Sequence, residues 1–337
     1  MKFSKISVCL DMKGCPNRCK HCWIGHLPNN NLQKEDLEFV AKSFAPYTDT
    51  LEVFSWFREP DYSDDYQELW EIEKKLCKNT LPKRFELLSF YRINRDPHYL
   101  KWAYDLGVRK CQLTFFGLEK NTDYYVGRSG AFKELINATN LLIENKIAPR
   151  YQVFVNKQSI SDINNFIELT KEMKLKERCL DIGQEFTLFI HQGTCDGENE
   201  LLYDIRITDE DLKYIPSEYL IFDLGKKESD LYQELINDHS TRNIVNNEPV
   251  FYVTSDFSVY PNYTNIAKPW CLGNLKKDSI EQILFNYQNN LSLAQNTSIN
   301  VPFSELVKKS GNPNSRRLFD TDDYIIYLLN KYLKSLY

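Results

Sequence analysis

Short apolar segments alternate with amphipathic helical segments through the first 195 residues, and this alternation limits the possible folds more than any other feature of the sequence. Such regularity predicts parallel strands joined by right-handed crossovers. Six units make about three quarters of an eight-unit barrel, so the predicted fold class is α/β, a partial (β/α)6 TIM-like barrel. The expected strands are Ile6–Leu10, Leu51–Trp56, Phe85–Phe90, Cys111–Phe116, Tyr151–Asn156 and Glu185–Ile190. The expected helices are Lys34–Phe44, Tyr66–Leu76, Pro97–Leu106, Ala131–Asn145 and Ser161–Met173.

The pattern changes after residue 195, and we expect a small C-terminal α+β extension. The expected regions are a core over 1–195, a connection of helices and loops over 196–249, a hairpin and helix over 250–290, and a loop and helix over 291–337. The hairpin is predicted because two short strand-like runs flank Ser255-Asp256-Phe257. The stretch 287–315 is rich in Asn, Ser and Gly, and we expect it to be loop.

Composition excludes several functional classes. The net charge of −5 argues against a general nucleic-acid binder, which would carry a basic excess. No run approaches the roughly 20 apolar residues that span a bilayer, and the first residues lack the apolar stretch of a signal peptide. We therefore expect a cytoplasmic protein without a membrane partner. Nine cysteines, an odd number, favour metal or redox chemistry over a disulfide framework in such a chain.

Three of these cysteines, Cys15, Cys19 and Cys22, fall within eight residues directly after the first expected strand. Thiolates are soft ligands that suit iron–sulfur clusters and zinc. Three ligands from one loop leave a fourth metal position without a protein ligand. A zinc site would need a further ligand, which His21 or His26 would supply. Unrelated thiols are the remaining alternative.

The CxxxCxxC spacing after the first strand resembles the signature of radical S-adenosylmethionine (SAM) enzymes. The resemblance implies that Cys15, Cys19 and Cys22 hold one [4Fe–4S] cluster whose open iron binds SAM. It implies that His21, which precedes the third cysteine, lies near the adenine. It also implies a flavodoxin- or ferredoxin-type electron donor. The partial barrel, predicted separately from the strand pattern, is the fold of that family.

Other segments are similar to the family's cofactor-binding positions. Glu59-Pro60 matches the end of the family's Gly-Gly-Glu-Pro motif, in which the Glu receives the SAM amino group, but Arg58 stands where the family has glycine. The segment after the fourth expected strand resembles the family's corresponding region. There Thr114 would lie near the ribose, and the planar guanidinium of Arg128 would pair with the SAM carboxylate. Asn156, at the end of the fifth expected strand, would contact ribose hydroxyls or form a strand-end turn.

The stretch 250–290 resembles the SPASM or Twitch extension of peptide- and sugar-modifying radical SAM enzymes. Those extensions hold auxiliary clusters with several cysteines, whereas Asn262 occupies the position of one such cysteine here. We therefore expect an extension that lacks most auxiliary-cluster ligands. Cys195 and Cys271 are candidate catalytic thiols that would donate a hydrogen atom in an epimerisation, or inert thiols.

The expected function is hydrogen abstraction from a peptide or small polar natural-product substrate by a 5′-deoxyadenosyl radical. Epimerisation or another C–H modification would follow. Two alternatives remain from the sequence. One is a zinc-binding interaction protein, and the other is a radical SAM scaffold without catalytic activity, because the Phe57-Arg58-Glu59-Pro60 segment departs from the family motif.

Overall fold

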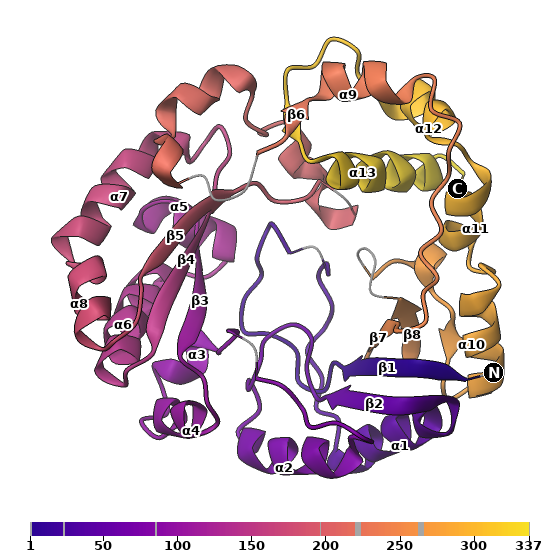
Figure 1. Cartoon of the computed structure of the whole chain (residues 1–337), viewed down its shortest axis with the longest axis horizontal. Coiled ribbons are helices and arrows are strands. Elements are labelled where there is room, and N and C mark those ends of the chain that lie inside the picture. The colour runs from indigo at the N-terminus through magenta and orange to yellow at the C-terminus, as the bar shows by residue number, and fades with distance from the viewer. Residues whose placement is uncertain are drawn as a thin grey trace.

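The computed structural model describes residues 2–22, 24–84, 86–195, 197–219, 224–261 and 266–336, with the side chains of 197–199 left out (Figure 1). Two sheets, one mixed and one parallel, lie on opposite sides of the long loop that follows the first strand (Figure 1). One sheet has the order β2-β1-β7-β8-β9, and the other has the order β3-β4-β5. The strands of the core are β1 (Phe3–Leu10), β2 (Thr48–Phe54), β3 (Lys110–Phe115), β4 (Ala148–Phe154) and β5 (Thr187–His191).

The prediction of a third strand at Phe85–Phe90 is wrong. Residues 86–89 form no strand, Phe85 lies outside the described residues, and the helix α3 (Phe90–Ile93) begins where the strand was expected to end. The backbone N–H of Ser89 donates to the Tyr99 hydroxyl at 3.3 Å, and the Ser89 hydroxyl caps α3. The Tyr99 side chain thus accepts the Ser89 N–H, a backbone group that a strand would pair with a neighbouring strand. The five core strands consequently lie in two sheets, and the residues that the structure describes form no closed barrel.

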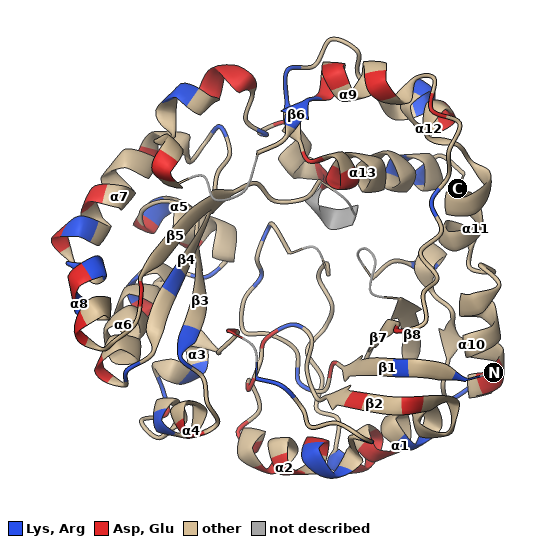
Figure 2. Ribbon diagram, in the orientation of Figure 1, with Lys and Arg blue, Asp and Glu red and all other residues tan. Residues whose placement is uncertain are grey.

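Helices cover the outer side of both sheets, and their outward faces carry many Lys, Arg, Asp and Glu residues (Figure 2). Alternate residues of β2, Leu51 and Val53, pack against Leu37 and Val40 of the helix α1 in one buried cluster. The intervening residues of β1 and β2 therefore face the centre of the molecule. The helices of this part are α1 (Lys34–Phe44), α2 (Tyr66–Leu76), α4 (Tyr99–Asp105), α5 (Glu119–Val126), α6 (Ala131–Glu144), α7 (Ile163–Glu172) and α8 (Leu175–Asp181).

The expected hairpin over 250–261 is present, and its first strand extends the sheet of the core. The strand β7 (Val250–Val253) pairs parallel with β1 and antiparallel with β8 (Ser258–Pro261). The short strand β9 (Gly273–Asn274) follows, and the helix α10 (Ile280–Gln288) comes next, as expected. Asn262 lies outside the described residues. The resemblance of this extension to SPASM and Twitch domains stays a prediction.

The expected loop over 287–315 is wrong, because two helices, α11 (Leu293–Asn300) and α12 (Phe303–Ser310), occupy most of it. The sequence of α11 lacks the apolar stripe that predicts a helix, because most of its buried residues are polar. Gln295 donates to the backbone carbonyl of Tyr287, and Ser298 donates to that of Arg242. The expected C-terminal helix is α13 (Thr321–Lys334).

The connection between β5 and β7 contains mainly short elements, followed by one helix. These are the 3₁₀ turns Gly197–Tyr203, Asp209–Tyr214 and Ser217–Tyr219, the strand β6 (Lys226–Lys227) and the helix α9 (Glu228–Leu235). The strand β6 pairs with β10 (Leu318–Phe319), and so ties the connection to the segment before α13. None of the helices in the described ranges is both long enough and apolar enough to cross a membrane.

Candidate cofactor site

The loop after β1 carries the three clustered cysteines and runs through the centre of the molecule (Figure 1). Arg58, which follows β2, fastens this loop. Its Nε atom donates to Asp11 at 2.8 Å, and its two terminal nitrogens donate to the carbonyl oxygens of Leu27 at 2.7 Å and Pro28 at 3.0 Å. Arg58 therefore binds both ends of the cysteine segment.

The helix α5 supports the other side of the loop. The backbone N–H groups of Arg18 and Lys20 donate to the carbonyl oxygens of Val126 and Tyr125, at 3.1 and 2.8 Å. Gly127, just after α5, has a φ of +72°, and a Cβ atom there would lie only 2.5 Å from the carbonyl oxygen of Arg18. The loop and α5 approach this closely because residue 127 has no side chain.

The cysteine loop opens on a cavity of about 720 Å³ between the two sheets. This volume is within the range of small-molecule and cofactor pockets, about 300–1,000 Å³. Six of the predicted site residues line it: Cys15, Cys19, Cys22, His21, Glu59 and Thr114. The structure therefore brings residues from the loop, from the segment after β2 and from β3 to one space.

The environment of the thiols disfavours their ionised form when no cation is present. Burial, and then the charge of Glu59, raises the pKa of Cys15, while burial and the Cys22 thiol raise that of Cys19. The Cys15 sulfur lies 3.9 Å from a Glu59 oxygen. In the described part of the chain, no three His, Cys, Asp or Glu side chains converge as ligands of one metal ion. A bound cationic centre would reverse the penalty on the thiolates.

Glu59 is held by a hydroxyl group at the edge of the cavity. The Ser89 hydroxyl donates to Oε1 of Glu59 at 2.5 Å. Burial raises the pKa of Glu59 to about 7, although the bond from Ser89 acts in the opposite direction. A bound cation would favour the carboxylate form of Glu59.

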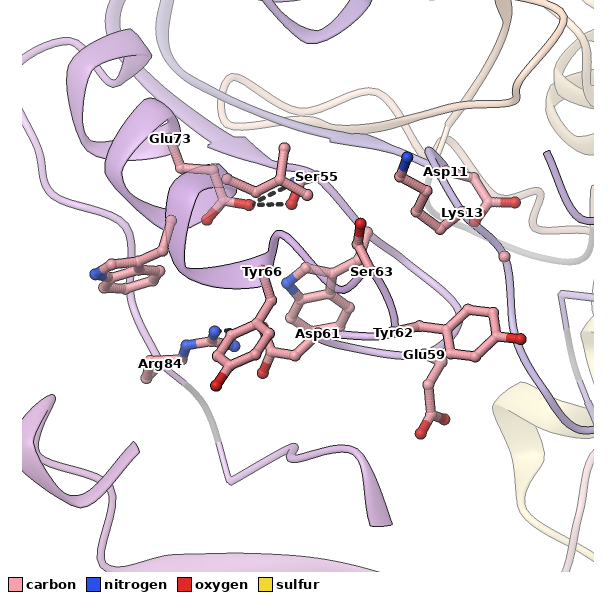
Figure 3. A pocket seen from close by; sticks show the side chains of 14 residues that line it. Asp11, Lys13, Ser55, Glu59, Asp61, Tyr62, Ser63, Tyr66, Glu73 and Arg84 are labelled. Atoms are coloured by element: carbon pink, nitrogen blue, oxygen red, sulfur yellow. Dashed lines mark hydrogen bonds and ion pairs between the residues drawn. The ribbon is translucent and has the colours of Figure 1, made fainter. Parts of the chain in front are cut away.

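A buried polar network contacts Ser89, and Figure 3 shows the part of it that Asp61 and Arg84 form. Tyr99, whose hydroxyl accepts the Ser89 N–H, donates to Asp61 at 2.5 Å. Asp61 forms an ion pair of 2.5 Å with Arg84. The Arg84 guanidinium lies over the rings of Trp70 and Trp102, 4.9 and 4.7 Å from their centroids. A small cavity of about 20 Å³ is lined by Asp61, by the hydrogen-bonded pair Ser55 and Glu73, and by Lys13 and Gly14 at the start of the cysteine loop.

His21 lies among aromatic rings. Its ring centroid is 4.6 Å from those of both Phe116 and Phe154. Burial, with a smaller effect of His191, lowers the pKa of His21 to about 3, so the ring is neutral at physiological pH.

Arg128 and Asn156 lie near the cavity but not among its lining residues. Arg128 donates to Asn17 at 3.0 Å and forms an ion pair of 2.6 Å with Glu134. Part of its planar guanidinium is thus already bound. The side-chain oxygen of Asn156 accepts the N–H groups of Gln158 and Ser159, so Asn156 forms the strand-end turn. Asn156 also lines a smaller cavity beside His21.

The two candidate hydrogen-donor cysteines do not line the large cavity. Cys195 is 2% exposed and belongs to the buried cluster around α13, where the Arg206 guanidinium donates to its sulfur at 3.2 Å. Cys271 is half-buried beyond β8, with its sulfur 3.6 Å from the Gly273 carbonyl oxygen. The structure therefore does not bring either thiol together with the cysteine loop, and their catalytic role stays a prediction.

Sequence reasoning missed the polar residues that face the cavity from the core strands. Lys5, Ser7 and Cys9 of β1 line it, as does Glu52 of β2. Ser89 and its supporting network were missed too, because they act on Glu59 from a segment expected to be a strand. The sequence did contain a signal for the cavity-lining residues of β1, because Lys5, Ser7 and Cys9 alternate with apolar residues at the period of a strand.

Comparison with known structures gives the fold. The structure of native anSMEcpe with bound AdoMet matches at a TM-score of 0.56 and 16% identity, covering 98% of each chain. The structure of anSMEcpe with bound AdoMet and the Cp18Cys peptide matches at a TM-score of 0.56 and 15% identity, covering 98% of this chain and 97% of that one. No protein-family model and no curated protein matches the sequence. Because anSMEcpe is a radical SAM enzyme, this chain has the fold of radical SAM enzymes.

Proposed function

We propose that the chain is a radical SAM enzyme that acts on a peptide or a small polar substrate. The observation that carries the proposal is the position of Cys15, Cys19 and Cys22. They line one cavity together with Glu59, in a fold shared with anSMEcpe, whose structure holds AdoMet. The cavity has the volume of a cofactor pocket. When bound, a [4Fe–4S] cluster and SAM would supply a 5′-deoxyadenosyl radical that abstracts hydrogen from a carbon atom.

The donor set fits these cofactors. Three thiols on one loop suit a cluster that spreads its ligands over separate irons. A structural zinc site would need a fourth ligand besides the three cysteines, which His21 or His26 would have to supply. Glu59, held by Ser89, would accept the SAM ammonium group. The neutral ring of His21 would pack beside the adenine, while Arg128 and Thr114 would approach the carboxylate and the ribose.

The substrate class in this proposal is supported by the second anSMEcpe structure, which holds the Cp18Cys peptide beside AdoMet. A flavodoxin- or ferredoxin-type protein would deliver the electron. The apolar side chains Phe54, Trp56, Phe57 and Tyr252 line the cavity and would keep water and competing hydrogen donors from the reacting carbon.

The proposal is tested by anaerobic reconstitution of the cluster, followed by its chemical reduction in the presence of SAM. We expect iron and sulfide in the purified protein, and 5′-deoxyadenosine as a product. The Cys15→Ala, Cys19→Ala, Cys22→Ala triple variant should lose both. Cys111→Ala and Cys77→Ala are matched controls that remove cysteines outside the cavity, and they should keep both.

The same experiment separates the alternatives. Zinc in place of iron would contradict the proposal and favour the zinc-binding interaction protein. Iron and sulfide with SAM binding, but without cleavage in the presence of candidate peptides, would favour the scaffold without catalytic activity.

A further inference from the structure

The end of the large cavity that lies away from the cysteine loop carries a polar group formed by Lys5, Ser7 and Glu52. Ser7 and Glu52 are register partners on neighbouring parallel strands, and both side chains face the centre. The Ser7 hydroxyl donates to Oε2 of Glu52 at 2.9 Å, and the Lys5 ammonium pairs with the same oxygen at 2.8 Å. At about 3.3 Å per residue, Ser7 lies roughly 10 Å along β1 from the start of the loop.

The second carboxylate oxygen of Glu52, Oε1, is buried and has no hydrogen-bond partner among the described residues. The Glu52 residue is only 4% exposed. A buried acceptor without a donor is costly, and native proteins keep few of them. This oxygen therefore marks a position where a donor from a bound molecule would be stabilising.

The charges of Lys5 and Glu52, together with the apolar residues around them, indicate which kind of hydrogen-bond donor the site would bind. Lys5 balances the charge of Glu52, so a cationic ligand would leave the site with an excess positive charge. The neighbouring residues that line the cavity are mainly apolar, including Phe54, Val250 and Tyr252. A neutral hydroxyl or amide N–H on an apolar body satisfies both conditions.

We propose that Lys5, Ser7 and Glu52 form a substrate-recognition site that binds a neutral hydroxyl or amide N–H donor carried on an apolar part of the substrate. The inference rests on the proposed function for its catalytic meaning, since the bound group would place the reacting carbon between this site and the cysteine loop. It favours peptide substrates with Ser, Thr, Tyr, Asn or Gln near the modified residue, and alcohol-bearing small molecules.

Binding of small probes to the full-length protein tests the inference. Benzyl alcohol offers a neutral donor on an apolar body, benzyl methyl ether has the same body without a donor, and benzylamine is a cation. Their dissociation constants are measured by saturation-transfer NMR with SAM present and absent. We expect benzyl alcohol to bind about tenfold more tightly than the ether, and also more tightly than benzylamine.

Glu52→Gln gives the discriminating measurement. The Gln side-chain oxygen would keep the bonds from Ser7 and Lys5, while its NH₂ group would occupy the place of the free oxygen. The site would then donate, and the tenfold preference for the alcohol over the ether should fall to about one. Glu86→Gln, which removes an ion pair with Arg150 outside the large cavity, is the matched control and should keep the preference.

An unchanged preference in Glu52→Gln, equal binding of alcohol and ether to the natural sequence, or no binding of the alcohol would each overturn the inference. SAM binding, measured by equilibrium dialysis on the same preparations, separates this result from a failure of the proposed function. A protein that binds SAM but shows no alcohol preference contradicts only the recognition site.

Discussion

The guanidinium of Arg58 forms an ion pair of 2.6 Å with Asp11, and the two side chains are only 6% and 3% exposed. The pair joins the segment after β2 to the first residue after β1. Arg58 occupies a position where the resemblance to radical SAM enzymes predicts glycine. Its side chain is used to hold the cysteine loop, so the departure from the motif has a structural explanation.

Arg58→Ala should lower the free energy of unfolding by about 3–5 kcal/mol, because it leaves Asp11 buried without its partner. Urea denaturation of the purified protein measures the loss. Arg316→Ala removes exposed ion pairs to Asp209 and Glu210 and should cost less than about 1 kcal/mol. Equal losses in the two variants would show that Arg58 does not fasten the loop.

Gly127→Ala should reduce the iron retained after reconstitution, because the new Cβ would press against the Arg18 carbonyl oxygen and displace the cysteine loop. Gly130→Ala is a close control. Gly130 also has a positive φ, +78°, but nothing lies within 4 Å of its added Cβ. That variant should lose about 1–2 kcal/mol of stability and keep its iron. Iron loss in both variants would point to backbone strain alone.

Ser89→Ala should weaken SAM binding by roughly three- to tenfold at pH 7, because Glu59 loses the donor that orients its carboxylate and favours ionisation. Removing that bond raises the pKa of Glu59 further, so the defect should shrink as the pH rises to 9. Equilibrium dialysis with labelled SAM measures the effect. Thr139→Ala, which removes a buried hydroxyl bonded to Tyr151, is the control and should leave SAM affinity unchanged.

Glu73 should make the folded protein less stable as the pH rises from about 4.5 to about 7. Burial raises the pKa of Glu73 from its ordinary value of 4.5 to about 7, despite bonds from the Ser55 N–H and hydroxyl. The folded state therefore binds this proton more tightly than the unfolded state does, and stability falls with increasing pH.

Glu73→Gln keeps a side-chain oxygen for Ser55 but cannot ionise. Relative to the natural sequence, the variant should gain up to about 3 kcal/mol of stability between pH 5 and pH 8. Chemical denaturation across this range checks the slope. A stability difference that does not change with pH would contradict the assignment.

The local parts of the fold could be predicted from the sequence. The bounds of α1 and α2 agree with the predicted segments, because each has a regular apolar stripe. The three cysteines were identified as one group because they are close in sequence, and Glu59 because Glu59-Pro60 resembles the end of the Gly-Gly-Glu-Pro motif of radical SAM enzymes. These features depend on residue order and spacing alone.

Only the tertiary structure shows which distant residues meet. Ser89 reaches Glu59 because its segment leaves the sheet and its backbone binds Tyr99, which local propensity cannot indicate. The helix α11 was missed because its buried face is polar and becomes stable only through partners elsewhere in the chain. Sequence reasoning assigned no role to Glu52 and Lys5, which line the cavity between the two sheets. The sequence therefore determined most elements of the core and the cysteine motif, whereas packing between sheets decided which side chains share the cavity, since those contacts join residues far apart in the chain.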